Sequence, residues 1–206
     1  LRMKQGETFI AKDGNGARSC CSIREFLGDS VIADIEKGQL ESTELPVRLV
    51  LFQGLPKADK MELIIQKSVE LGAAEIVPVE MTRCVVKLDE KKKKNKLARW
   101  QSISESAAKQ SGRTVIPEVK NVISFGEALK YADSLDLLLV PYECADSLKM
   151  LRKKIDEIKP GMSVGIFIGP EGGYEEKEIE EAKKNGGEIV SLGKRILRTE
   201  TAAIAA

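Results

Sequence analysis

The stretch Ser163-Val-Gly-Ile-Phe-Ile-Gly-Pro-Glu-Gly-Gly-Tyr174 decides the fold class, because it joins an apolar run of strand length to a glycine-rich turn. Ser163 to Ile168 is predicted to be a buried strand, and a helix is predicted over Glu175 to Lys184. The same order of strand and then helix recurs upstream. This alternation predicts an α/β fold with a mainly parallel sheet that helices cover on both faces.

The other elements of this α/β part follow from Pro46 onward. A helix is expected to begin at Asp59, with Glu62 completing a capping box, and to stop at Gly72. Further strands or extended segments are expected at Val47–Gln53, Glu75–Val79, Val115–Val122, Leu135–Val140 and Glu188–Leu192. Further helices are expected at Glu90–Ser111, Phe125–Ala132 and Ser147–Ile158.

The first 44 residues have a different sequence pattern, in which short β-strands are expected between turn residues. Strands are expected at Thr8–Lys12, Ala17–Phe26 and Val31–Glu36, and Asp13-Gly-Asn-Gly16 suits a hairpin turn that needs positive φ. These strands predict a small β-barrel whose first strand is missing, followed by a polar linker at residues 38–44. The expected domains are therefore residues 1–44 and 45–206.

Composition excludes several classes of site. The chain has no histidine, which excludes the Ser-His-Asp and Cys-His mechanisms. The four cysteines, Cys20, Cys21, Cys84 and Cys144, form no CxxC pair, so we expect reduced thiols and no metal. No apolar run is long enough to cross a bilayer and no signal-peptide pattern opens the sequence. A cytoplasmic protein with no membrane partner is expected.

Positive charge gathers in residues 82–113, which carry ten basic and three acidic residues. That segment has a net charge of +7, while the whole chain has only +1. A local cationic patch favours a polyanionic partner such as RNA. The alternative for the lysine run Lys91 to Lys94 is a merely solvated helix face.

The loop Gly169 to Gly173 is a candidate ligand site, because its small residues let a ligand approach the backbone closely. A plain turn between strand and helix is the alternative. The chain has neither a GxGxxG fingerprint nor a GxxxxGK[ST] loop, and Glu171, Glu175 and Glu176 would repel a phosphate at the helix start. A ligand without phosphates, such as S-adenosyl-L-methionine, fits this loop better.

A second dense segment, Ser191-Leu-Gly-Lys-Arg-Ile-Leu-Arg-Thr-Glu-Thr-Ala202, places arginines, threonines and a glutamate around an apolar pair. It suits a pocket for an adenine or methionine group, and a simple lead into an alanine-rich helix is the alternative. Together with Ile168–Gly173, this segment resembles the SPOUT class of methyltransferases and, more narrowly, the RsmE family. The resemblance extends through Leu51–Lys57, Lys67–Gly72 and Gln110–Arg113.

The resemblance implies a SPOUT-type parallel sheet with a C-terminal trefoil knot, preceded by a PUA-like RNA-binding domain, and a homodimer as the active form. It implies methylation of N3 of a uridine in 16S ribosomal RNA, as free RNA or in the small-subunit particle. A non-catalytic ribosome assembly factor, or a SPOUT enzyme acting on a ribose hydroxyl or on transfer RNA, remains the alternative.

The resemblance also supplies candidate site residues. Arg198 and Glu200 are the catalytic candidates, Glu200 as base or organiser and Arg198 for the anion developing on the uracil, and a structural Arg–Glu pair is the alternative. The expected cofactor-binding residues are Ile168, Gly169, Pro170, Glu171, Gly172, Gly173, Leu192, Gly193, Ile196, Leu197, Arg198, Thr199, Thr201 and Ala202. The expected RNA-binding residues are Arg83, Lys109, Gln110, Ser111 and Arg113.

Overall fold

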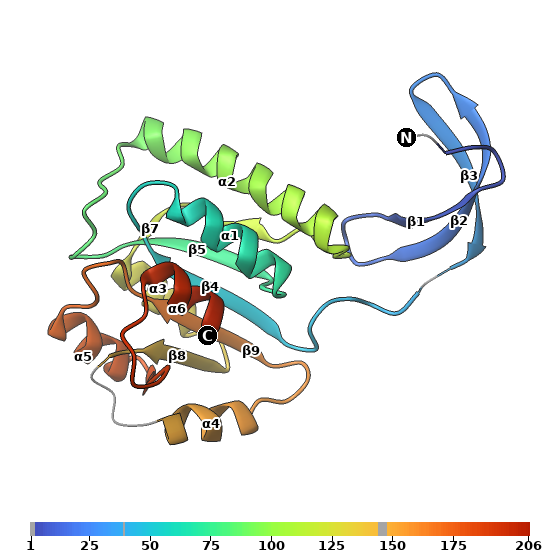
Figure 1. Ribbon diagram of the computed structural model, residues 1–206. Coiled ribbons are helices and arrows are strands. Elements are labelled where there is room, and N and C mark those ends of the chain that lie inside the picture. Colours follow the sequence, from blue (N-terminus) through green and yellow to red (C-terminus); the bar gives the residue numbers. More distant parts are fainter. Residues whose placement is uncertain (1–2, 39, 144–147) are drawn as a thin grey trace. The chain divides into compact units, whose positions relative to one another are not determined.

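The computed structural model describes residues 3–38, 40–143 and 148–206. The chain divides into two compact units (Figure 1). The first comprises residues 1–44 and 108–116, and the second residues 45–107 and 117–206. Residues 108–116 thus group with the N-terminal unit, whereas the boundary expected from the sequence puts them in the larger domain.

The first unit contains a three-stranded antiparallel sheet in the order β1 (Thr8–Lys12), β2 (Arg18–Leu27), β3 (Ser30–Lys37). At the β1–β2 turn, the Asp13 carboxylate accepts hydrogen bonds from the amides of Asn15 and Ala17. Both turn glycines have positive φ, which is why glycine serves there. The expected strands are present, and closure into a barrel stays a prediction.

The second unit is built on a seven-stranded sheet in the order β10-β8-β9-β4-β5-β6, with β7 also pairing to β5. Every pairing in it is parallel, which confirms the α/β class and the mainly parallel sheet. The strands are β4 (Arg48–Gly54), β5 (Glu75–Glu80), β6 (Glu118–Val119), β7 (Ile123–Ser124), β8 (Leu137–Pro141), β9 (Ser163–Ile168) and β10 (Glu188–Val190).

Helices follow most of these strands. They are α1 (Lys60–Glu70), α2 (Glu90–Ser111), α3 (Phe125–Ala132), α4 (Leu148–Asp156), α5 (Glu176–Lys184) and α6 (Thr199–Ala205). The capping box expected at the start of α1 is wrong, since Asp59 makes no side-chain cap hydrogen bond. Glu62 instead forms an ion pair with Arg99 of α2 at 2.6 Å, so its carboxylate is engaged away from the start of α1. The expected start of α4, Ser147, lies outside the described residues.

Three strands are shorter than expected. The segment expected to be extended at Val115–Val122 forms a strand only at β6. β8 begins at Leu137 because the Asp136 carboxylate is engaged with the amide and hydroxyl of Ser163. β10 ends at Val190 because the Ser191 hydroxyl accepts from the Gly193 amide in a turn where Gly193 has a φ of 118°. Both turns lie beside strands of the site.

The core of the second unit lies along the two central strands. Phe52 of β4 and Phe167 of β9 are fully buried and their rings stack with centroids 5.4 Å apart. Phe125 of α3 packs on Phe167 with centroids 5.1 Å apart. Burying such aromatic side chains stabilises the fold by about 2–3 kcal/mol each. Because β9 is tightly packed, the loop that follows Ile168 starts from a fixed position.

Candidate active site

A cavity of about 460 Å³ opens beyond the carboxyl ends of β8, β9 and β10, within the second unit. Its walls are the loop from Ile168 to Tyr174, the segment after β10 from Ser191 to Thr199, and Pro141 to Glu143 after β8. Ligands of open parallel sheets bind at this edge. The volume is in the range of roughly 300–1,000 Å³ that small-molecule sites occupy.

Packing explains why glycine occupies the loop after β9. A Cβ on Gly169 would lie 3.2 Å from the Tyr174 ring, and one on Gly172 would lie 2.8 Å from the Arg83 Cβ. Gly173 has a φ of +67°, which a side chain disfavours. The Tyr174 hydroxyl donates to the Phe167 carbonyl, and full burial raises the pKa of Tyr174 well above its ordinary value. The neutral, buried side chain of Tyr174 therefore supports this loop.

Nearly all of the predicted cofactor residues line this cavity. Thr201 does not, and its side chain is exposed. The lining members of that set are Ile168, Gly169, Pro170, Glu171, Gly172, Gly173, Leu192, Gly193, Ile196, Leu197, Arg198, Thr199 and Ala202. Two segments that are separated in sequence by helix α5 and strand β10 therefore face one space.

The two catalytic candidates occupy different places. Arg198 lines the cavity and is exposed. The Glu200 carboxylate is only 16% exposed and lies 3.2 Å from the Lys60 ammonium. In the described part of the chain the ion pair of Glu200 is with Lys60, and a structural pair between Arg198 and Glu200 stays an alternative.

Thr199 joins three elements through its hydroxyl group. It accepts a hydrogen bond from the buried amide of Gln53 in β4 at 2.9 Å and donates one to the Gly169 carbonyl at 2.6 Å. The start of α6 is thereby tied both to the central sheet and to the loop after β9. This hydroxyl is used within the protein, so its part in the site is to hold the walls together.

Sequence reasoning missed several lining residues, among them Lys60, Tyr142, Tyr174 and Arg195. Tyr142 was within reach of prediction, because it follows β8 at the edge where ligands of parallel sheets bind. Its ring stands nearly perpendicular to that of Tyr174, with centroids 6.2 Å apart. Lys60 lies more than 100 positions before the loop, and only tertiary structure brings it there.

Arg83, an expected RNA contact, follows β5 and touches the glycine loop. Its guanidinium donates to the Gly172 carbonyl at 3.1 Å while the side chain remains exposed. Beside it, the amide and hydroxyl of Thr82 donate to Glu178 in α5, at 3.0 and 3.1 Å. The segment after β5 therefore braces the loop, and an RNA contact by Arg83 stays a prediction.

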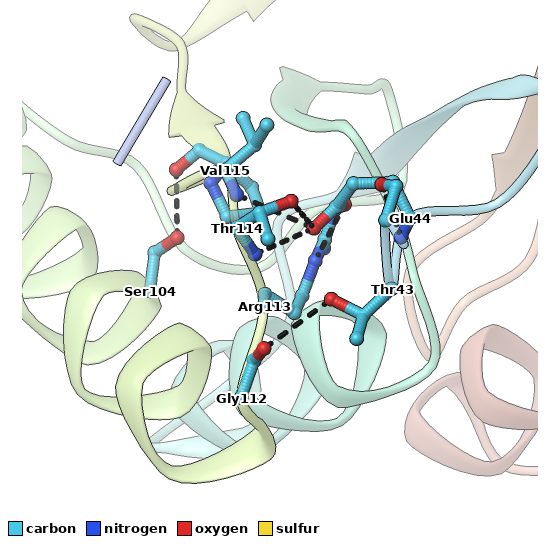
Figure 2. A network of polar contacts seen from close by, with 9 residues as sticks. Thr43, Glu44, Ser104, Gly112, Arg113, Thr114 and Val115 are labelled. Atoms are coloured by element: carbon cyan, nitrogen blue, oxygen red, sulfur yellow. Dashed lines mark hydrogen bonds and ion pairs between the residues drawn. The ribbon is translucent and has the colours of Figure 1, made fainter. Parts of the chain in front are cut away.

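Arg113 is buried within the first unit. Its guanidinium donates to the Glu44 carboxylate, which also accepts from the Thr114 amide and hydroxyl and from the Val115 amide (Figure 2). Partial burial raises the pKa of Glu44, but Arg113 and the amides outweigh it and hold that pKa below its ordinary value. Only 5% of the Arg113 side chain is exposed, so an RNA contact there would require this pair to open.

The other expected RNA residues, Lys109, Gln110 and Ser111, are exposed. Part of the lysine run on α2 is compensated locally. Lys92 pairs with Asp89, and Lys93 contacts Glu90 and Glu80. Asp89 and Glu90 are already included in the net charge of +7, so only the contact of Lys93 with Glu80 reduces the charge further.

The described part of the chain offers neither a cluster of metal ligands nor a membrane-spanning helix. Residues 3–38, 40–143 and 148–206 contain no cluster of three or more potential metal-ligating side chains. Cys20, Cys21 and Cys84 are free thiols, and Cys144 lies outside the described residues. No helix in those ranges has the length and apolar character needed to span a membrane.

Comparison with known proteins identifies related chains. The RNA methyltransferase domain family matches residues 43–206. The chain is 38% identical to ribosomal RNA small subunit methyltransferase E of Bacillus subtilis, over 99% of this chain and 81% of that protein. It is 32% identical to the Synechocystis protein of the same name, over 98% of this chain and 65% of that protein.

Two solved structures hold S-adenosylmethionine. One is ribosomal RNA small subunit methyltransferase E from Neisseria gonorrhoeae, 35% identical, with a TM-score of 0.81, over 100% of this chain and 82% of that one. The other is a putative methyltransferase from Legionella pneumophila, 33% identical, with a TM-score of 0.80 and the same coverage. The chain therefore belongs to the ribosomal RNA small subunit methyltransferase E family.

Proposed function

We propose that this protein transfers a methyl group from S-adenosyl-L-methionine to N3 of a uridine in 16S ribosomal RNA. The observation that carries the proposal is the cavity shared by the loop after β9 and the segment after β10. Relatives of the same name support the substrate class, and two similar structures were solved with S-adenosylmethionine bound.

The chemistry of the lining fits this cofactor. S-adenosylmethionine has a carboxylate, an ammonium group and an adenine ring. Arg195 and Arg198 offer cationic partners, Glu143 an anionic one, and Tyr142 an aromatic face. The Glu171 carboxylate, which would repel an anion, is already engaged by Lys60 and by the Lys57 amide. When bound, the cofactor supplies an electrophilic methyl group on a sulfonium.

The protein's own residues have two tasks in such a transfer. Holding the acceptor in line with the methyl group supplies much of the rate. The uridine must also lose its N3 proton, which passes to solvent water, and Arg198, which is exposed in the cavity wall, would stabilise the resulting anion. Because the Glu200 carboxylate is paired with Lys60, we assign it the role of organiser in preference to that of a free base.

The wider assembly is part of the same proposal. The N-terminal strands would belong to a PUA-like domain that binds RNA, together with Arg83, Lys109, Gln110, Ser111 and Arg113. The sheet would carry a SPOUT-type trefoil knot at its C-terminal end, the active form would be a homodimer without metal, and the protein would act in the cytoplasm on the small-subunit particle or its RNA. Family resemblance supports these points.

Mass mapping of nucleosides tests the reaction. The protein is incubated with S-adenosylmethionine and either small-subunit RNA or particles or transfer RNA, and the digested RNA is searched for methylated nucleosides, 3-methyluridine above all. We expect that product from the wild type and at least a 100-fold lower rate from Arg198→Ala, as for the loss of an oxyanion donor. Arg152→Ala, on the exposed face of α4, is the matched control.

The outcome also separates the alternatives. A methylated ribose, or a product only in transfer RNA, assigns a different target. RNA binding without any methylated nucleoside indicates an assembly factor and overturns the proposed reaction.

A further inference from the structure

Lys60, the first residue of α1, contacts two walls of the cavity at once. Its ammonium lies 3.0 Å from the Glu171 carboxylate in the loop after β9. It lies 3.2 Å from the Glu200 carboxylate in the first turn of α6. Lys60 itself lines the cavity. One cation therefore bridges two segments that both contact the ligand space.

The three side chains are partly exposed, with exposed fractions of 31% for Lys60, 26% for Glu171 and 16% for Glu200. Hydrogen bonding to Glu171, against some loss from burial, raises the pKa of Lys60. Partial burial raises the pKa of Glu171, but the bond and charge of Lys60 together with the backbone amides of Lys57 and Glu171 outweigh it and hold that pKa below its ordinary value. Without Lys60, two carboxylates would converge with no cation between them.

The turn before α1 aims Lys60 at this position. The Lys57 amide donates to the same Glu171 carboxylate at 3.0 Å. Between the two lysines, Ala58 has a φ of 53°, a conformation uncommon for a residue with a side chain. A strained residue held between two contacts to one carboxylate indicates that the turn and the loop support each other.

The helix that Lys60 holds, α6, begins at Thr199, directly after Arg198 in the cavity wall. It lies beside α1 (Figure 1) and depends on contacts such as the Thr199 hydrogen bonds and the Glu200 ion pair. Because α6 contributes Thr199 and Ala202 to the cavity, its docking sets the shape of the site.

We propose that Lys60 is a positioning residue that couples the docking of α6 to cofactor binding. The inference rests on the proposed function, since the ligand is taken to be S-adenosylmethionine. Lys60 acts through Glu171 and Glu200: it fixes the distance between the loop after β9 and α6 and so pre-forms the cavity. Ligand binding in turn stabilises the docked helix.

Two measurements on the whole protein test this coupling. Amide hydrogen exchange of residues 199–205 without ligand reports α6 docking, and calorimetry with S-adenosylmethionine reports affinity. For Lys60→Met we expect α6 exchange about tenfold faster and the Kd about tenfold higher, the sum of two partly exposed ion pairs. Lys60→Arg should restore most of both. Lys67→Met, which removes an ion pair to Glu70 on the same helix, is the matched control and should leave both unchanged.

The outcomes are separable. If α6 exchange and affinity in Lys60→Met match those of the Lys67→Met control, the proposal is overturned. Faster α6 exchange with an unchanged Kd also overturns it, because docking would then not be coupled to binding. If the wild type takes up no S-adenosylmethionine, the proposed function fails, and α6 exchange still decides whether Lys60 holds the helix.

Discussion

Replacing Gly54 by alanine should displace the loop after β9, because this loop packs directly against Gly54. Gly54 is the last residue of β4 and is buried. A Cβ there would lie 2.6 Å from the Pro170 Cδ, 2.7 Å from the Pro170 nitrogen and 2.8 Å from the Met81 sulfur. The sulfur can move with its flexible side chain, but the proline nitrogen is backbone. The added methyl group therefore pushes on the loop itself.

The magnitude follows from these distances. Ordinary contacts of a Cβ are about 3.4–4 Å, so Pro170 would have to retreat by roughly 0.7 Å. Overpacking of this kind costs about 1–3 kcal/mol. If the loop stays in place, that cost appears as a lower free energy of unfolding. If the loop yields, it appears as a 5- to 150-fold weaker affinity for S-adenosylmethionine.

Urea denaturation and calorimetry on the same preparation separate these two results. Gly126→Ala is the matched control, because Gly126 lies in the first turn of α3 and a Cβ there meets nothing within 4 Å. That control should be neutral or slightly stabilising. Wild-type stability together with wild-type affinity in Gly54→Ala would refute the claim that close backbone packing shapes the loop.

Three other changes test further parts of the structure. Glu44→Gln should lower the free energy of unfolding by about 2 kcal/mol at pH 7, because charge-assisted bonds to Arg113 and two amides are weakened. Since the pKa of Glu44 is depressed on folding, this stabilisation is present above about pH 4.5 and is lost as pH falls below it, so urea curves of variant and wild type should converge in acid. Tyr174→Phe removes the bond to the Phe167 carbonyl and should cost about 1–2 kcal/mol in the same assay, and a neutral result would contradict the bracing role of the tyrosine. Neutralising Lys91 to Lys94 with glutamine should reduce the salt dependence of RNA binding in filter assays, and an unchanged slope would show that the lysine run is a solvated face.

The regular part of the fold could be predicted from the sequence. Apolar runs of strand length that alternate with helical segments predict a parallel sheet. The first and last residues of α2, α3 and β9 are the expected ones. Two errors arose where a side chain bonds across the fold, and the early end of β10 comes from a local turn at Ser191. Glu62 reaches Arg99 and so makes no capping box, and Asp136 reaches Ser163 and delays the start of β8.

Some residues of the candidate site could be predicted from the sequence and others could not. The residues of Ile168–Gly173 and Leu192–Ala202 could be found because each forms a compact motif at the end of a strand. Lys60 could not, since its position beside Glu171 depends on the turn before α1 and on the docking of α6. The burial of Arg113 was equally hidden, because an arginine after a helix has the same sequence pattern whether it binds RNA or pairs with Glu44.

Calorimetric titration of the protein with S-adenosylmethionine, and in parallel with ATP, tests the central claim most directly. Both ligands carry adenine, but only ATP brings phosphates toward the helix start at Glu175 and Glu176. The cavity at the ends of β8, β9 and β10 predicts saturable uptake of one S-adenosylmethionine per chain and no measurable uptake of ATP. Uptake of ATP alone, or of neither ligand, would contradict it.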